Sequence, residues 1–352
     1  MKEKDGITAL LTAVLTAQWF GASAAGLLPA AGNAAYLSIL LAGAGLTALC
    51  IALPRLLPQE GLLEICKAQR GMKGFLWIAA LLFTLLSAAA LRDVLSQLKL
   101  TLLPETPRWF ALALMLPAVF AMGKGGTAGI LRTVRLLAPL LVGLYGAVLV
   151  LSGWKQFDVY GLFPLLGRGL SGIGKAAGSA MTAGVWLAPV LLTHCPAKKS
   201  RCARRACIGS TILAAAGYLC CAMLPDGSSE AAAYPLHRIT LSGGVSFAFE
   251  RMQALFVFVW LPIQTAAVSA GLALAAECIH TALPDKSNAS VLCPLIAAAA
   301  MLALPDPERS PAWLTLLMQT NTQCLVLLPL LIPLGGGKQK EQRTAREENS
   351  HA

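Results

Sequence analysis

Two glycine-rich interruptions in long apolar segments are the residues in this chain best suited to form a binding site. Residues 21–26, GASAAG, carry almost no side-chain bulk, and Ser23 adds a hydroxyl between Gly21 and Gly26. A later apolar segment contains Gly178 and Gly184. An interrupted helix in lipid frees backbone N–H and C=O groups, which neighbouring helices, water or a ligand must satisfy. These residues predict a ligand site between the two segments, and a packing seam of small residues is the alternative interpretation.

A second group of candidate residues lies where a later apolar segment begins. Glu250 and Arg251 stand side by side at its start, and Trp260 follows nine residues after the arginine. The charged pair can fix a helix register or gate an outer vestibule, whereas an arginine that only snorkels to the membrane surface is the alternative. Trp260 lies too deep for an interfacial aromatic belt, so we expect it to pack in the bundle or to line the ligand cavity.

The sequence contains no pattern typical of covalent catalysis or of a cofactor site. It has no nucleophile–base motif and no phosphate-binding loop. Cys195, Cys202 and Cys207 lie close to His194, but their spacing matches no zinc pattern and five cationic residues stand among them. We therefore expect a binding protein rather than an enzyme, with neither a metal nor a cofactor.

The composition is that of an integral membrane protein. Hydrophobic residues make up 57% of the 352 positions and charged residues only 13%, whereas a soluble protein carries about twice that charged fraction. The net charge of +11 fits basic residues on cytoplasmic loops better than it fits a nucleic-acid binder.

Apolar runs that approach twenty residues predict ten membrane spans. They are Ile7–Leu28, Ala34–Leu53, Phe75–Leu98, Phe110–Met122, Leu136–Leu151, Ala176–Thr193, Ala206–Leu224, Met252–Ala276, Ala289–Leu304 and Trp313–Leu334. With the N-terminus inside, the segments predicted to be cytoplasmic hold 19 of the 28 lysine and arginine residues. This bias predicts that both termini are cytoplasmic.

The ten spans divide into two sets of five, each with an interrupted first span and a short fourth span. Matching interruptions in two halves indicate an inverted repeat, and an odd number of spans per half requires the second half to be inverted. We therefore predict one all-α transmembrane domain over residues 1–334, with repeats at about 7–151 and 176–334. The tail, residues 335–352, is polar, and we expect it to be disordered and cytoplasmic.

The residues around the entry to the eighth span carry a resemblance to a known family. An aromatic–proline pair, a basic residue, Phe-x-x-Arg and a tryptophan follow one another at Tyr234, Pro235, Arg238, Phe249, Arg251 and Trp260. Pro164, Gly167 and Gly169 lie in a similar way in the loop before the sixth span. This arrangement resembles the integral-membrane B subunit of the spore germinant receptors, a branch of the amino acid–polyamine–cation transporter superfamily.

The resemblance implies an amino acid transporter-like fold and a subunit that binds a small nutrient, with an amino acid as the expected ligand, to trigger germination. It also implies two partners, a larger membrane subunit and a lipoprotein subunit, in the inner membrane of a bacterial spore. The chain departs from the family's usual pattern at Gln253, where an acidic residue is usual, and in its sixth span, which lacks the glutamate often found there. An amino acid or cation transporter and a structural scaffold subunit are the alternatives.

Overall fold

The computed structural model describes residues 2–20, 24–56, 73–101, 107–124, 126–153, 157–182, 196–224, 252–283 and 289–303, and every regular element in this part of the chain is a helix. The α-helices are α1 (Lys2–Phe20), α2 (Ala24–Ala31), α3 (Ala35–Leu56), α5 (Lys73–Thr101), α6 (Arg108–Lys124), α7 (Gly126–Gly153), α8 (Leu170–Met181), α10 (Pro196–Ala222), α12 (Met252–Ala282) and α13 (Ala289–Ala303). Two 3-10 helices, η1 (Gly32–Ala34) and η3 (Val159–Leu162), lie in the connections. Because lipid offers no hydrogen-bond partners, apolar segments of this length satisfy their backbone groups by forming helices.

Several of these helices are long and apolar enough to cross a bilayer, as a multi-pass membrane protein requires. Among the described residues, five segments meet this criterion, namely Leu27–Ala52, Leu76–Ser96, Gly126–Leu151, Arg201–Ala222 and Val257–Ala282. Gly6–Phe20, Trp109–Ala121 and Val291–Ala303 are shorter apolar helices. The predicted all-helical membrane architecture is thus confirmed for the described residues, whose regular elements are all helices and which include five segments that could span a bilayer. The last predicted span, Trp313–Leu334, lies outside the described residues.

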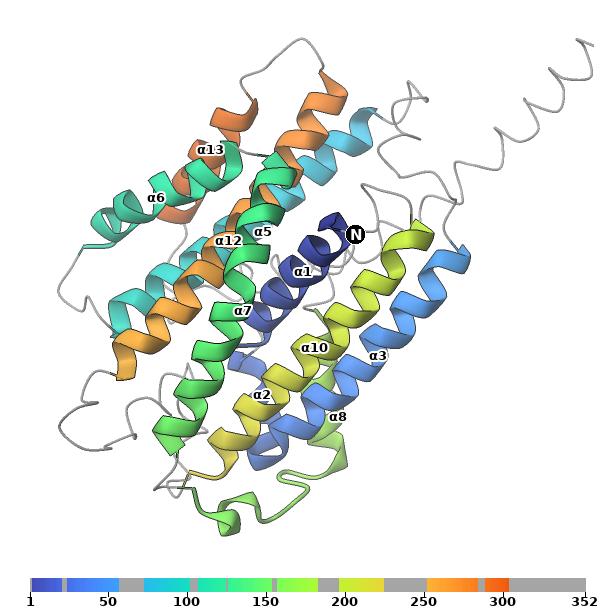
Figure 1. Cartoon of the computed structure of the whole chain (residues 1–352), viewed down its shortest axis with the longest axis vertical. Coiled ribbons are helices and arrows are strands. Elements are labelled where there is room, and N and C mark those ends of the chain that lie inside the picture. The colour runs from blue at the N-terminus through green and yellow to red at the C-terminus, as the bar shows by residue number, and fades with distance from the viewer. Residues whose placement is uncertain are drawn as a thin grey trace, which may run out of the picture.

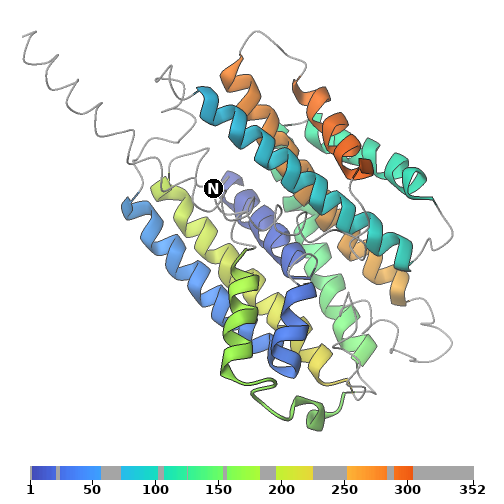
Figure 2. The same cartoon turned by 180° about the vertical axis from the view of Figure 1, so that it is seen from behind.

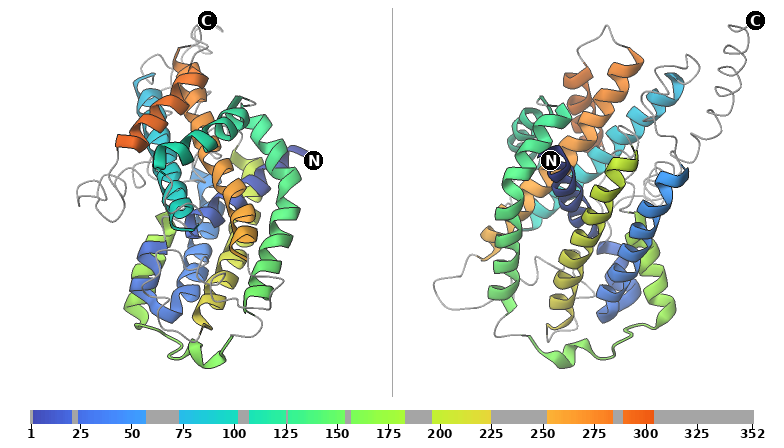
Figure 3. Two further views of the ribbon diagram at one scale, coloured as in Figure 1. Left: turned by 90° about the vertical axis from the view of Figure 1, so that its left-hand side faces the viewer. Right: turned by 45° about the vertical axis from the view of Figure 1, so that its right-hand side comes forward.

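The helices pack in two groups, joined by α7 (Figure 1). The first helix group consists of α1, α2, α3, α8 and α10, in which α10 packs against both α1 and α3. The second helix group consists of α5, α6, α12 and α13, in which α12 packs along α5. The view from behind shows the two groups side by side (Figure 2). Contacts of α1 with α7 and α12 hold the groups together, and the turned views show α7 running along their shared side (Figure 3).

Several hydroxyl side chains inside the spans form hydrogen bonds within their own helices. Their oxygens donate to the carbonyl four residues earlier, which lets a polar residue sit in an apolar segment without an unpaired donor. The bonds join Thr12 to Thr8, Thr47 to Gly43, Thr84 to Ala80, Ser210 to Ala206 and Thr265 to Leu261, all at 2.7–2.8 Å. These five hydroxyls therefore bond within single helices rather than between helices.

Two helices start ten residues earlier than their apolar runs predict. The fifth span was predicted from Leu136, but α7 begins at Gly126 and includes Arg132 and Arg135. The seventh was predicted from Ala206, but α10 begins at Pro196 and carries the basic cluster that the sequence placed in a loop. A hydropathy count stops at the first cationic side chains, whereas a helix continues past the membrane surface with those side chains exposed.

The charged pair in the third predicted span lies inside the protein. Arg92 is only 8% exposed, and its Nη2 lies 3.9 Å from Oδ1 of Asp93. Both residues belong to α5, which packs against α12 and α13. The two charged groups therefore pair within the helix bundle.

Candidate functional site

The first and sixth predicted spans meet at the ends of two helices. The first span is divided between α1, which ends at Phe20, and α2, which begins at Ala24. The sixth span begins with α8, which ends at Met181. The indole N–H of Trp19 donates to the carbonyl of Ala180 over 2.9 Å, so the last turns of α1 and α8 are joined directly.

The last carbonyls of α1 receive hydrogen bonds from two other helices. The hydroxyl of Tyr218 in α10 donates to the carbonyl of Trp19 over 2.7 Å. The side-chain amide of Gln264 in α12 donates to the carbonyl of Ala17 over 3.3 Å. Helices α10 and α12 thus each supply a side-chain donor to the backbone of the last turn of α1.

Aromatic packing fixes the same helix end. The ring of Phe20 stacks on that of Tyr218, with ring centroids 5.6 Å apart and planes inclined by 20°. On its other side, Phe20 meets Tyr145 of α7 at 5.9 Å. Both distances lie in the range where aromatic pairs attract beyond simple burial. The end of α1 is therefore held by side chains from α7, α10 and α12 and by the Ala180 carbonyl of α8.

Helices α2 and α8 approach each other closely at the end of the bundle away from the N-terminus (Figure 2). A Cβ atom added at Gly172 or at Gly167 would collide with the carbonyl oxygens of Ala30 and Ala31 respectively. Gly167 also has a φ of +51°, a conformation that favours glycine. The guanidinium of Arg168 donates to the carbonyl of Pro29 over 2.6 Å. The loop before α8 is thereby fastened to the last turn of α2.

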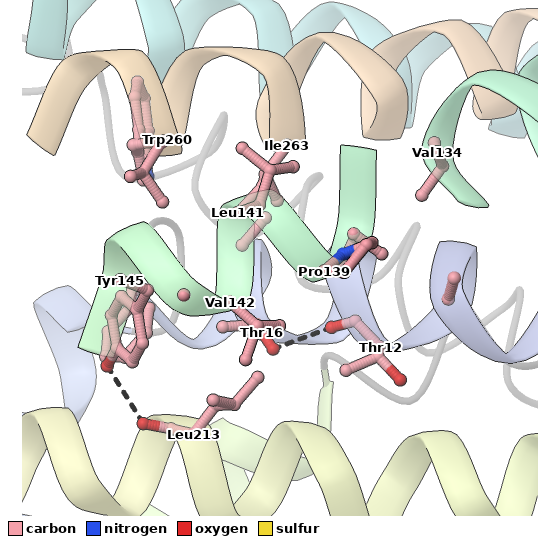
Figure 4. A pocket seen from close by; sticks show the side chains of 17 residues that line it. Thr12, Thr16, Val134, Pro139, Leu141, Val142, Tyr145, Leu213, Trp260 and Ile263 are labelled. Atoms are coloured by element: carbon pink, nitrogen blue, oxygen red, sulfur yellow. Dashed lines mark hydrogen bonds between the residues drawn. The ribbon is translucent and has the colours of Figure 1, made fainter. Parts of the chain in front are cut away.

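A cavity of about 600 Å³ runs along α1. It lies between α1, α7, α10 and α12, with Phe20 at the end of its α1 wall (Figure 4). Trp260, predicted to pack in the bundle or to line the ligand cavity, is buried and lines this cavity together with Ile263. The lining is almost entirely apolar, so the cavity suits hydrocarbon rather than a charged group.

The structure places some of the predicted site residues and leaves others outside its described part. Gly26 lies in α2, on the far side of the division in the first span. Gly178 lies in α8 on an exposed face, where an added Cβ would meet no atom within 4 Å. The close approach of α8 to α2 therefore runs through Gly167 and Gly172 instead. Gly21, Ser23, Gly184, Glu250 and Arg251 lie outside the described residues.

Sequence reasoning overlooked the residues that hold the helix ends. Trp19, Tyr218 and Gln264 were not singled out, although Trp19 and Phe20 directly precede the bulk-free stretch that begins at Gly21. Two large aromatic side chains beside a run of glycine and alanine indicate a place where one helix ends against its neighbours. Tyr218 and Gln264 give no such signal, because nothing near them in the sequence differs from an ordinary span.

Comparison with known proteins gives one match. The family model described as "Spore germination protein" matches residues 11–311. The matched region includes the ends of α1 and α8, the cavity and the whole of α12. A comparison with curated proteins finds no match for this chain.

Proposed function

The chain belongs to the spore germination protein family, and on this basis we propose that it is the nutrient-binding membrane subunit of a spore germinant receptor, with an amino acid as its ligand. The observation that carries the proposal is the meeting of the first and sixth spans at two helix ends, joined by the bond from Trp19 to Ala180. The role is binding rather than catalysis, in keeping with a family of transporter-like germination proteins.

The charges of an amino acid match the polarity of these helix ends. The C-terminal ends of α1 and α8 carry partial negative charge, which attracts an ammonium group. The N-terminal end of α2, at Ala24, carries partial positive charge, which attracts a carboxylate. Gly21, Ser23 and Gly26 would leave room for the ligand beside these ends, with Gly178 and Gly184 on the opposing span and Trp260 at the mouth of the apolar cavity.

We further propose that the complete domain, residues 1–334, has ten spans in an inverted five-plus-five repeat, over about 7–151 and 176–334. The division of the first span into α1 and α2 supports this fold, since divided helices at matching places form the central site in proteins built from such repeats. Both termini would then be cytoplasmic, with residues 335–352 as a disordered tail. The subunit would act in the spore inner membrane with a larger membrane subunit and a lipoprotein subunit.

Reporter fusions test the proposed topology. Fusions after Leu53 and Thr193 are expected to report a cytoplasmic location, and fusions after Thr106 and Ser228 an external one. The reason is the concentration of basic residues on the segments assigned to the inside. An external signal from a fusion at Lys199, within the densest basic cluster, would contradict the topology.

Substitution of the small residues tests the ligand site. Gly26→Leu and Gly184→Leu are expected to abolish the germination response to amino acids while the protein level stays unchanged, because a large side chain takes the space of the ligand. Gly174→Leu is the matched control, since an added Cβ at this exposed position of α8 meets no atom within 4 Å. Loss of protein together with response would indicate a packing role, and an unchanged response would refute the site.

Arg251 and Glu250 are proposed to gate the outer mouth or to support assembly. If the pair is buried, Arg251→Ala leaves an uncompensated carboxylate, at a cost of about 3–5 kcal/mol, and Arg251→Lys restores the function only in part. Receptor abundance and germination response are measured for both variants. Full activity of Arg251→Ala would show that the arginine only snorkels.

Transport and a scaffold role are the competing functions, and each predicts its own result. Counterflow of labelled amino acid in proteoliposomes would indicate a transporter that completes its cycle. For a scaffold, substitutions in the proposed site would change neither the amino acid specificity nor the germination response. Removal of the whole subunit would nevertheless disassemble the receptor.

A further inference from the structure

The apolar cavity beside α1 has properties that an amino acid site would not have. Its polar side chains are already bonded within the protein. Thr12 donates to the carbonyl of Thr8 over 2.8 Å, and Thr16 donates to the carbonyl of Thr12 over 2.7 Å (Figure 4). Tyr145 donates to the carbonyl of Leu213 over 2.9 Å. A charged or polar ligand group buried here would lose its water without regaining equivalent bonds, which is costly.

The cavity is also longer than an amino acid side chain. Its α1 wall extends from Ala9 to Phe20. At a rise of 1.5 Å per residue, these residues stand about 16 Å apart along the helix. A volume of about 600 Å³ with these proportions suits a flexible hydrocarbon chain that lies along α1.

The opposite wall of the cavity continues into a surface that faces lipid. Helix α7 contains the candidate span Gly126–Leu151, and its Leu136 and Leu140 are 79% and 59% exposed. Val142 lines the cavity and is itself 48% exposed. In a membrane protein such an apolar face meets acyl chains, so the cavity and the lipid-facing side of α7 form one continuous apolar surface.

We propose that the cavity between α1, α7, α10 and α12 binds an acyl chain of a membrane phospholipid. The chain reaches it from the bilayer past α7 and lies against α1 between the two helix groups. It contacts Phe20, which packs against Tyr218 and Tyr145 at the end of α1. Lipid bound here would therefore support the helix end that joins α8. The inference does not depend on which nutrient the protein binds.

Gly143 provides a direct way to fill the cavity. It lines the cavity, and an added Cβ would meet no atom within 4 Å, so Gly143→Phe places a ring there without a collision of its Cβ. Gly146→Phe is the matched control, because Gly146 lies in the same helix with equally open space but does not line the cavity. Both substitutions remove a helical glycine, so their effects on helix propensity are equal.

The experiment uses the full chain in vesicles that contain a phospholipid with a photoreactive group on its acyl chain. After irradiation, labelled peptides are mapped by mass spectrometry. We expect label on the cavity-facing residues of α1 and α12 in the wild type and in Gly146→Phe, and its loss in Gly143→Phe. Label on the outer face of α7, near Leu136 and Leu140, is expected to be the same in all three proteins.

Two results would overturn the proposal. One is label confined to the outer face of α7 in the wild type, and the other is equal labelling of the cavity residues in Gly143→Phe. If the phenylalanine variant does not fold, Gly143→Leu occupies less of the cavity and is expected to reduce the same label in part. An undiminished label in a folded Gly143→Leu protein would then count against the site.

Discussion

The two helix groups are held together in different ways. In the first helix group, side chains of one segment donate to backbone carbonyls at the helix ends of another, as Trp19 does to Ala180 and Arg168 does to Pro29. In the second helix group, Ser269 of α12 donates to the carbonyl of Val119 in α6 over 3.4 Å. That carbonyl lies within a continuing helix, whereas Ala180 and Pro29 lie in the last turns of α8 and α2.

This difference follows from where the helices end. Where a helix ends inside a membrane protein, the carbonyls of its last turn lack partners within the helix. Lipid cannot supply them, and in α1 the carbonyls of Ala17 and Trp19 accept from Gln264 and Tyr218. Helices α5 and α12 run 29 and 31 residues without a break, so their backbone groups bond largely within each helix, although Pro262 removes one donor from α12. Interrupted helices thus bring specific polar contacts to the first group, and these contacts surround the proposed ligand site.

Removal of Trp19 is expected to have the largest effect. The side chain is fully buried, at 0% exposed, so Trp19→Ala leaves a large cavity and is expected to destabilise the protein by about 3–5 kcal/mol. The midpoint of thermal unfolding in detergent measures the loss. Trp77→Ala, in the second group at a position 46% exposed, is the control and is expected to change the midpoint far less. Equal effects would show that the helix end of α1 is not a special contact.

Gly172→Ala tests the close approach of α2 and α8. The added methyl group meets the backbone carbonyl of Ala30, so we expect destabilisation by about 1–3 kcal/mol through overpacking. Gly174→Ala in the same helix has open space, and we expect it to stabilise the protein by about 0.5–1 kcal/mol. Thermal unfolding of the two variants side by side measures the difference, and a Gly172→Ala protein as stable as Gly174→Ala would rule out the close approach.

Tyr218→Phe removes one hydrogen bond while it keeps the ring that stacks on Phe20. The carbonyl of Trp19 then loses its side-chain donor at the end of α1. We expect a loss of stability of about 1 kcal/mol. Tyr160→Phe, at an exposed position, is the control. A Tyr218→Phe protein as stable as the wild type would mean that water or another group satisfies this carbonyl.

Ser269→Ala is expected to have the smallest effect, about 0.5 kcal/mol or less. The serine hydroxyl also bonds within its own helix, to the carbonyl of Thr265 over 2.7 Å, and the carbonyl of Val119 lies inside α6. Thermal unfolding again provides the measurement. A loss as large as that of Tyr218→Phe would erase the proposed distinction between the two helix groups.

The sequence was sufficient to predict the helices and the division of the first span, but not the contacts that stabilise the division. Helix formation depends on residues that are close in the sequence, and the apolar runs therefore predict the starts of α3, α5, α12 and α13 to within a few residues. The bonds from Trp19 to Ala180 and from Tyr218 to Trp19 join residues 161 and 199 positions apart. No local pattern encodes such pairings, because they depend on how whole helices pack. The cavity was unpredictable for the same reason, since four helices contribute its walls.

Direct binding of amino acids to the purified protein tests the proposed site most sharply. Each of the common amino acids is titrated into the wild type, Gly26→Leu and Gly174→Leu in lipid nanodiscs, with thermal unfolding as the check on folding. We predict that the wild type and Gly174→Leu bind at least one amino acid with equal affinity, and that folded Gly26→Leu does not bind it. Wild-type affinity in Gly26→Leu would contradict a nutrient site at the division of the first span.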